Sequence, residues 1–134
     1  MPTVEGGNNR TEYDCQAIID FFNRYPDATV ILEKAQYTPM LGGIASFSFG
    51  KSYGLMLGML IALNRRHHLV AAKTWQTMMF KGQAYVNTKA ASAIVAKRLF
   101  PAHDFRATLK SKKAHDGKTD ATLIAVYAQT MNLQ

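Results

Sequence analysis

The sequence predicts an α/β layer fold in a single domain over residues 1–134. Short apolar segments typical of buried strands alternate with segments whose apolar residues recur at helical spacing, a pattern typical of layered α/β proteins. A length of 134 residues, of which 48% are hydrophobic, suits one domain with a workable core. No internal repeat, low-complexity tract or inter-domain linker interrupts the alternation.

The first half of the chain is expected to hold two helices, one strand and one long loop. The apolar residues of segment 14–24 follow helical spacing, and Pro26 ends this helix. Residues 28–33 form an apolar run that predicts a strand buried on both faces, as in parallel sheets. The glycine-rich segment 38–49 is expected to be a loop, and residues 50–66 a helix.

The second half continues the alternation. A second strand is expected over residues 67–72, followed by a short helix over 74–80. A longer helix over 88–100 ends at Pro101. A basic loop over 102–115 then leads into the last helix, over 116–131.

Three glycines mark one face of the helix predicted over residues 50–66. Gly50, Gly54 and Gly58 lie four residues apart and therefore share this face. Each glycine costs a helix roughly 1 kcal/mol relative to alanine. Close approach of another backbone would offset that cost. The other backbone belongs either to a neighbouring helix of the same chain or to a second subunit.

The charge is distributed unevenly along the chain. The net charge is +7, yet residues 1–33 carry six acids against two arginines. Residues 34–134 carry fourteen lysines and arginines against three aspartates, Asp104, Asp116 and Asp120. A basic body of this kind suits a polyanion such as nucleic acid, although a plain solvated basic surface gives the same composition.

Other features of the composition predict a cytoplasmic protein. The single cysteine, Cys15, excludes an internal disulfide and fits a reducing compartment. The first residues lack the basic and apolar regions of a signal peptide. The longest apolar run, within residues 55–63, is shorter than the roughly 20 residues that a membrane span needs. We therefore expect no membrane segment.

The tripeptide Gly50-Lys51-Ser52 has to be distinguished from a P-loop. That motif requires a glycine five residues before its last glycine, directly after a strand. Ala45 occupies this position, and the predicted loop starts well past the end of the strand. The sequence therefore does not predict a cradle for nucleotide phosphates.

An acid, Glu33, stands at the end of the first apolar strand. In open α/β sheets, ligands bind beyond the carboxyl ends of the strands. A carboxylate at such a place is costly unless it is solvated, paired or bound to a metal ion. A surface ion pair with Lys34 or another cation is the alternative to a binding role.

Two further acids, Asp116 and Asp120, lie four residues apart at the head of the last helix. This spacing puts both carboxylates on one face, with Cβ atoms about 6 Å apart, where they repel unless a cation lies between them. Acids in a first helical turn also favour the dipole and can cap free amides, which would explain Asp116 alone. For the pair, we favour metal binding.

The three acids together suggest phosphodiester chemistry. Mg²⁺ prefers oxygen ligands and keeps several waters, so that two or three carboxylates are enough. Two such ions about 4 Å apart can activate a water and stabilise the leaving oxygen of a phosphodiester. We therefore expect Mg²⁺ (or Mn²⁺) on Glu33, Asp116 and Asp120, with the basic surface holding the polyanion.

Five segments in order resemble motifs of RuvC-type Holliday junction resolvases, particularly those of phages and prophages. They are VILEKAQ, SFSFGKSYGLMLGML, LVAAKTWQ, RLFP and HDGKTDATLIAVY, and they lie in this order between residues 30 and 127. The resemblance implies a ribonuclease H-like fold, with helices flanking a small mixed sheet. It also implies a homodimer in a bacterial or phage-infected cell that cleaves four-way DNA junctions with magnesium during recombination and repair.

The resemblance also implies roles for single residues. Glu33 matches the acid of the family's second motif, Asp120 the final acid of the last helix, and Asp116 its upstream partner. The helix over residues 50–66 lies where relatives dimerise. Aromatic residues in the preceding loop would approach the junction centre, where stacking on a base is worth about 1–3 kcal/mol. The implied DNA contacts are Phe47, Phe49, Lys51, Lys110, Lys112, Lys113 and Lys118.

One part of the family pattern has no counterpart here. In RuvC-type enzymes an earlier strand carries an aspartate, in an Asp-x-Gly pattern, that bridges both metal ions and pairs with the strand bearing Glu33. The resemblance begins after that strand, so the expected domain is N-terminally truncated and exposes an apolar strand edge. The alternatives to an active endodeoxyribonuclease are a catalytically inactive DNA-binding module and an oligomeric structural module.

Overall fold

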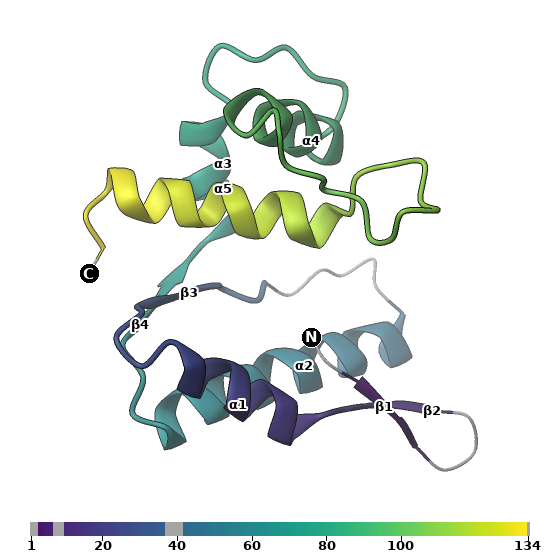
Figure 1. Cartoon of the computed structure of the whole chain (residues 1–134), viewed down its shortest axis with the longest axis vertical. Helices are drawn as coiled ribbons and strands as arrows, with labels where there is room; N and C mark the ends of the chain where they lie inside the picture. The colour runs from purple at the N-terminus through teal and green to yellow at the C-terminus, as the bar shows by residue number, and fades with distance from the viewer. Residues whose placement is uncertain (1–2, 7–9, 37–41, 134) are drawn as a thin grey trace.

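A computed structural model of the chain describes residues 3–6, 10–36 and 42–133 (Figure 1). Within these residues five helices and two small sheets confirm the α/β class. The elements, in order, are β1 (Thr3–Gly6), β2 (Arg10–Tyr13), α1 (Cys15–Arg24), β3 (Val30–Glu33), α2 (Gly43–Ala62), β4 (His67–Val70), α3 (Ala72–Met79), α4 (Thr88–Leu99) and α5 (Asp116–Thr130).

The strands form two separate pairs in the described part of the chain. β1 and β2 make an antiparallel hairpin, and β3 and β4 pair in parallel with Val30 opposite His67 and Glu33 opposite Val70. A single mixed sheet, as the resemblance implies, is not seen among the described residues, whose strands form one antiparallel and one parallel pair. The edge of β3 that faces away from β4 has no strand partner among the described residues, which agrees with the expected open edge.

The parallel pair separates two helical layers (Figure 1). Because side chains alternate along a strand, Ile31 packs toward the layer of α3, α4 and α5, whereas Val30 and Leu32 pack toward α1 and α2. The expectation that this strand is buried on both faces is wrong, because all four residues of β3 are only half-buried. One edge of β3 is open, so no neighbouring strand screens it there.

The layer of α3, α4 and α5 contains the larger core. Trp75 and Leu123 have no exposed surface, and the alanines of α4 let that helix pack closely against α5. Phe80 and Phe105, from the loops that flank α4, close the ends of this core. The short helix predicted around Trp75 and the helix predicted after Asn87 are confirmed, with ends within two residues of the expected ones.

The layer of α1 and α2 has a smaller core, formed by Ile18, Phe22 and Leu60. Helix α1 begins as predicted, with the Asp14 carboxylate accepting a hydrogen bond of 2.9 Å from the Ala17 amide. After α2, the Arg65 guanidinium donates a hydrogen bond of 2.7 Å to the Pro26 carbonyl and so connects the end of α2 to the turn that follows α1.

Helix α2 begins at Gly43, seven residues before the predicted start. The prediction of a loop over residues 38–49 is therefore wrong from residue 43 onward, and Phe47, Phe49 and Lys51 all lie in the helix. Glycine and serine lower helix propensity only modestly, and no proline interrupts this stretch, so the apolar run extends the helix. Residues 37–41 of the predicted loop lie outside the described residues.

Much of α2 faces outward. Ile44 is 90% exposed, Phe47 74% and Ile61 63%. A Cβ built at Gly50, Gly54 or Gly58 would meet no described atom within 4 Å, so the interpretation as packing within the chain is wrong. By length and composition alone, α2 is the described helix that could cross a membrane, a property shared by some helices of soluble proteins.

Candidate metal and nucleic-acid site

A cavity of about 580 Å³ lies between β3 and α5. Its β3 wall consists of residues from the open edge, namely Thr29, Ile31 and Glu33. Its α5 wall includes Asp120 and an apolar stretch, and the chain that follows α5 completes it. The residues of this second wall are Gly117, Asp120, Ala121, Ile124, Ala125, Ala128, Gln129, Asn132 and Leu133. The cavity thus brings together two acids that are far apart in the sequence.

Glu33 is held by a core residue of the layer of α3, α4 and α5. Trp75 has no exposed surface, and its indole Nε1 donates a hydrogen bond of 2.8 Å to Oε2 of Glu33. A buried indole N–H needs an acceptor, so this bond fixes the side chain at the carboxyl end of β3. Glu33 is half-buried and forms no ion pair among the described residues, so the expected alternative of a pair with Lys34 is not seen.

Asp120 is a half-buried acid whose surroundings disfavour its ionised form. Burial raises the pKa of its carboxyl group, and the nearby Asp116 raises that pKa further, while a hydrogen bond with Ser92 and the charge of Lys89 act in the opposite direction. Ser92 is itself 1% exposed on α4, so the bond fixes the Asp120 carboxylate against α4. A cation in the cavity would favour the charged form of this group.

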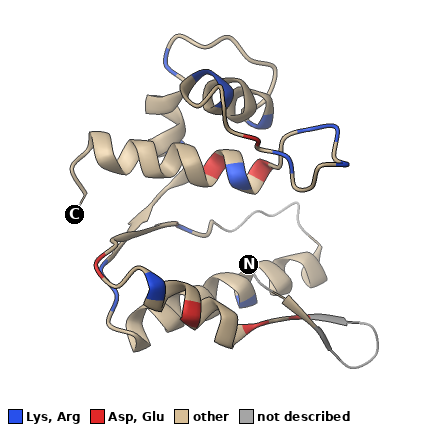
Figure 2. Cartoon of the chain, viewed as in Figure 1, with Lys and Arg blue, Asp and Glu red and all other residues tan. Residues whose placement is uncertain are grey.

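Asp116 points elsewhere. Its carboxylate forms an ion pair of 2.8 Å with Lys89 at the start of α4, and it does not line the cavity. The hydrogen bond and charge of Lys89 hold the pKa of Asp116 below its usual range. No side chain caps the start of α5, so the capping role considered for Asp116 is not observed. Figure 2 shows two acidic positions on α5 on either side of a basic one.

The three predicted acids are therefore only partly brought together. Glu33 and Asp120 share the cavity, while Asp116 is a neighbour of Asp120 that is engaged with Lys89. Within residues 3–6, 10–36 and 42–133, no group of three or more metal-ligating side chains is preassembled. The two cavity acids form the candidate metal site.

The predicted DNA-binding residues lie on two elements. Phe47, Phe49 and Lys51 occupy the first turns of α2, and all three are exposed. Lys110, Lys112 and Lys113 are exposed on the loop between α4 and α5. Lys118, by contrast, donates a hydrogen bond of 2.6 Å to the Arg106 carbonyl and so stabilises that loop. Helix α2 begins, and the lysine loop projects, toward the same side of the view in Figure 1.

Three residues of the site were not identified from the sequence. Trp75 orients Glu33, Ser92 contacts Asp120, and Lys89 neutralises Asp116. A serine on an otherwise apolar helical face was a usable signal, because a buried hydroxyl needs a partner. The contacts of Trp75 with Glu33 and of Lys89 with Asp116 join elements that are distant in the sequence, so no local sequence pattern predicts them.

Comparison of the sequence with protein-family models and with curated proteins gives no match.

Proposed function

We propose that this protein is a metal-dependent endodeoxyribonuclease of the RuvC type that cleaves four-way DNA junctions. The observation that carries the proposal is the convergence of Glu33 and Asp120 on one cavity. The order of the motifs in the sequence also assigns these two acids to one site. The ribonuclease H-like fold is part of the same proposal, and the parallel β3–β4 pair between helical layers is compatible with it.

The donor set of the cavity suits a hard divalent cation. Glu33 has one carboxylate oxygen bound to Trp75, which leaves the other for an ion. Asp120 is an acid whose ionised form is disfavoured by burial and by Asp116, so a nearby cation would stabilise it. When bound, Mg²⁺ or Mn²⁺ would supply charge stabilisation at the phosphodiester and lower the pKa of a water. Asp116 could join the site by exchanging its ion pair with Lys89.

The open edge of β3 also supports the family assignment. In RuvC-type enzymes the strand with the Asp-x-Gly aspartate pairs with the strand that bears the second-motif acid. Here the corresponding edge is unpaired in the described residues and is bordered by the cavity. An added strand would find main-chain groups to pair with on β3 and the apolar side of α5 to cover it.

The surfaces around the site are suited to DNA and to a second subunit. Exposed lysines on the α4–α5 loop would bind phosphates, with the salt dependence that phosphate contacts bring. Phe47 and Phe49, on the exposed start of α2, would stack on unpaired bases. A Cβ on the glycine face of α2 would meet no described atom within 4 Å, and this face would pack against the same helix of a partner to form a homodimer.

Cleavage of a synthetic four-way junction in Mg²⁺ tests this proposal. We expect the wild-type protein to nick the junction in preference to linear duplex, and Glu33→Gln and Asp120→Asn to lower the rate at least 100-fold. Asp20→Asn is the matched control, because Asp20 is an exposed acid on α1 whose carboxylate accepts a hydrogen bond from the exposed Gln16 side chain. Cleavage that persists in both site variants would refute the assignment.

One observation favours a second candidate, a catalytically inactive RuvC-like module that binds DNA or assembles as an oligomer. Only two acids line the cavity, and Asp116 is neutralised by Lys89. This candidate predicts tight binding of four-way junctions without nicking in Mg²⁺ or Mn²⁺. A gel-shift titration beside the cleavage assay separates the two.

A further inference from the structure

The loop between α4 and α5 is a built structure. The His115 amide donates a hydrogen bond of 2.8 Å to the Phe105 carbonyl, and Arg106 and Ala114 form an antiparallel bridge. Phe105 is buried in the main core. The two ends of the loop are therefore fixed to each other and to the body of the protein.

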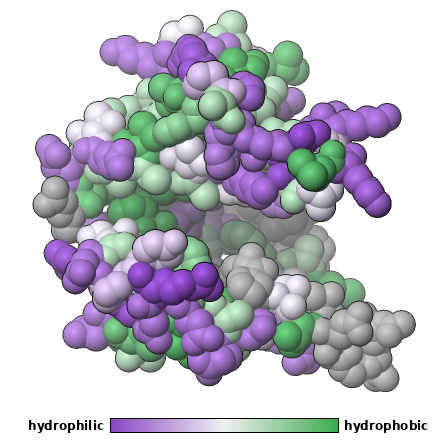
Figure 3. Space-filling view, in the orientation of Figure 1, coloured by the Kyte–Doolittle hydropathy of each residue, from purple (hydrophilic) through white to green (hydrophobic). Residues whose placement is uncertain are grey.

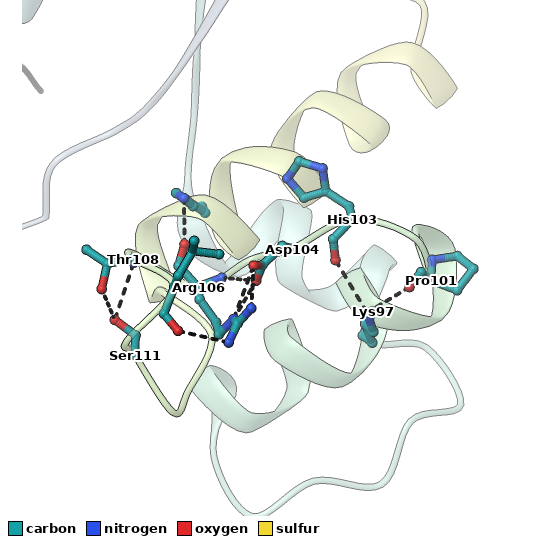
Figure 4. Close-up of polar contacts among 9 residues, drawn as sticks. Lys97, Pro101, His103, Asp104, Arg106, Thr108 and Ser111 are labelled. Carbon is teal, nitrogen blue, oxygen red and sulfur yellow. Dashed lines mark hydrogen bonds and ion pairs between the residues drawn. The ribbon is translucent and has the colours of Figure 1, made fainter.

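The Arg106 guanidinium organises the interior of this loop (Figure 4). Its Nε and Nη2 donate to the Asp104 carboxylate at 2.9–3.1 Å, and its Nη1 donates to the Leu109 carbonyl at 3.1 Å. The hydrogen bonds from Arg106 hold the pKa of Asp104 well below its usual range, so the ion pair between Arg106 and Asp104 stays charged at neutral pH. Because the guanidinium fork is planar and rigid, it fixes where the tip of the loop lies.

The tip is a turn with an unusual residue at its head. The Ser111 amide donates to the Thr108 carbonyl at 3.0 Å, and the two hydroxyl groups lie 3.1 Å apart, which closes a turn around Leu109 and Lys110. Such turns favour Gly, Pro, Asn, Asp or Ser, yet this one presents a leucine that is 82% exposed. Leu109 therefore points into solvent from a fixed support.

Three lysines closely follow this leucine in the chain. Lys110, Lys112 and Lys113 are exposed, and none of them is in an ion pair with a described residue. In Figure 3 a hydrophobic patch lies among projecting hydrophilic side chains over this loop. An apolar tip beside exposed lysines complements a polymer that is anionic outside and apolar inside.

We propose that Leu109 is a wedge that enters the base stack of duplex DNA while the flanking lysines bind the phosphates on either side. This inference rests on the proposed function for the identity of the polymer, and it adds a residue to which the DNA-binding assignment gave no role. Leucine is one of the side chains that unstack a base step and bend the duplex. An anionic membrane is less suitable, because one leucine offers little apolar area for insertion.

The experiment uses duplexes that carry 2-aminopurine at successive positions, with EDTA present so that no cleavage occurs. Wild-type protein should raise the fluorescence at one or two positions, because unstacking relieves quenching. Leu109→Ala should abolish that rise and weaken binding about 5- to 20-fold, with the salt slope unchanged because the lysines remain. Val86→Ala is the control, since Val86 is 96% exposed on the α3–α4 loop.

Replacement of the three lysines tests the phosphate contacts separately from the wedge. Replacing Lys110, Lys112 and Lys113 by alanine should lower the salt slope by up to about three, as expected for the loss of three phosphate contacts. Wild-type affinity and fluorescence in Leu109→Ala would overturn the wedge. Loss of binding to phosphatidylserine vesicles in Leu109→Ala, with DNA binding intact, would overturn it in favour of a membrane contact.

The outcome is separable from that of the nuclease proposal. Unstacking that depends on Leu109, in a protein that never nicks a junction, would uphold the wedge and refute the nuclease. Junction cleavage that Leu109→Ala leaves unchanged, together with equal 2-aminopurine fluorescence in wild type and variant, would uphold the nuclease and refute the wedge.

Discussion

The two helical layers of this protein differ in how completely they bury their own apolar residues. The layer of α3, α4 and α5 covers a contiguous core around Trp75 and Leu123. Among the described residues, the layer of α1 and α2 buries Ile18, Phe22 and Leu60, and it leaves Ile44, Phe47 and Ile61 of α2 exposed. One layer is therefore complete within the described chain, while the other presents a surface suited to a partner.

The same contrast separates the two proposed roles. The acids of the cavity are oriented by the complete layer, through Trp75 for Glu33 and Ser92 for Asp120. The glycine face belongs to the layer of α1 and α2. A partner packed on this face would fix the position of its side chains. The proposed metal ligands thus contact the layer with the larger core, and the proposed dimer contact lies on the other layer.

The largest expected effect is on the complete layer. Trp75→Ala should lower the free energy of unfolding by about 3–5 kcal/mol, because it leaves a large cavity and removes the partner of Glu33. Leu60→Ala, in the smaller core, should cost about 2 kcal/mol because its surroundings can relax. Urea unfolding measures both, with Met78→Ala on the outer side of α3 as the control. Equal losses at positions 75 and 60 would contradict the difference between the layers.

The next effect concerns assembly. Wild-type protein should have twice the chain mass of 14.9 kDa in light scattering, and Gly54→Arg should dissociate it with an increase of at least 100-fold in the dimer Kd. The fold of each chain should persist, because a Cβ at position 54 meets no described atom within 4 Å. Ser48→Arg, on another face of α2, is the matched control. A wild-type monomer at high concentration would refute the dimer.

A smaller change is expected at the Lys89 ion pair. Lys89→Gln removes a cation that acts on both Asp116 and Asp120, so the affinity for Mn²⁺ should rise about two- to tenfold. Stability should change by less than about 1 kcal/mol, because the pair is exposed. Isothermal titration at low salt measures the affinity. An unchanged or weaker affinity would show that the ion lies away from α5.

The smallest effect is a gain in stability when the cavity acid is neutralised. An acid whose pKa is raised on folding opposes the folded state once it ionises, so the stability it removes is lost as the pH rises through that pKa. Asp120→Asn should therefore raise Tm at pH 7 by about 2 °C, a modest value because the group is half exposed. The gain should vanish below about pH 4, where the wild-type group is protonated. A lower Tm at pH 7 would contradict this electrostatic interpretation.

The sequence predicts most of the elements and part of the site. Apolar runs and helical periodicity locate β3, β4 and the last helices within a few residues, because each of these elements contributes apolar side chains to one of the two cores. The start of α2 is misplaced because its apolar residues are exposed and its glycines resemble those of a loop. Among the acids, Glu33 and Asp120, which the motif order assigns to one site, line the same cavity, but the engagement of Asp116 by Lys89 depends on how α4 packs against α5.

The central claim is that Glu33 and Asp120 bind the same divalent ion, and a double-mutant cycle of Mn²⁺ affinity tests it most directly. Each single variant, Glu33→Gln or Asp120→Asn, should weaken binding at least tenfold. The double variant should be little worse than either, because two ligands of one ion act as a unit. Unchanged affinity in the single variants, or strictly additive losses in the double variant, would contradict a shared site.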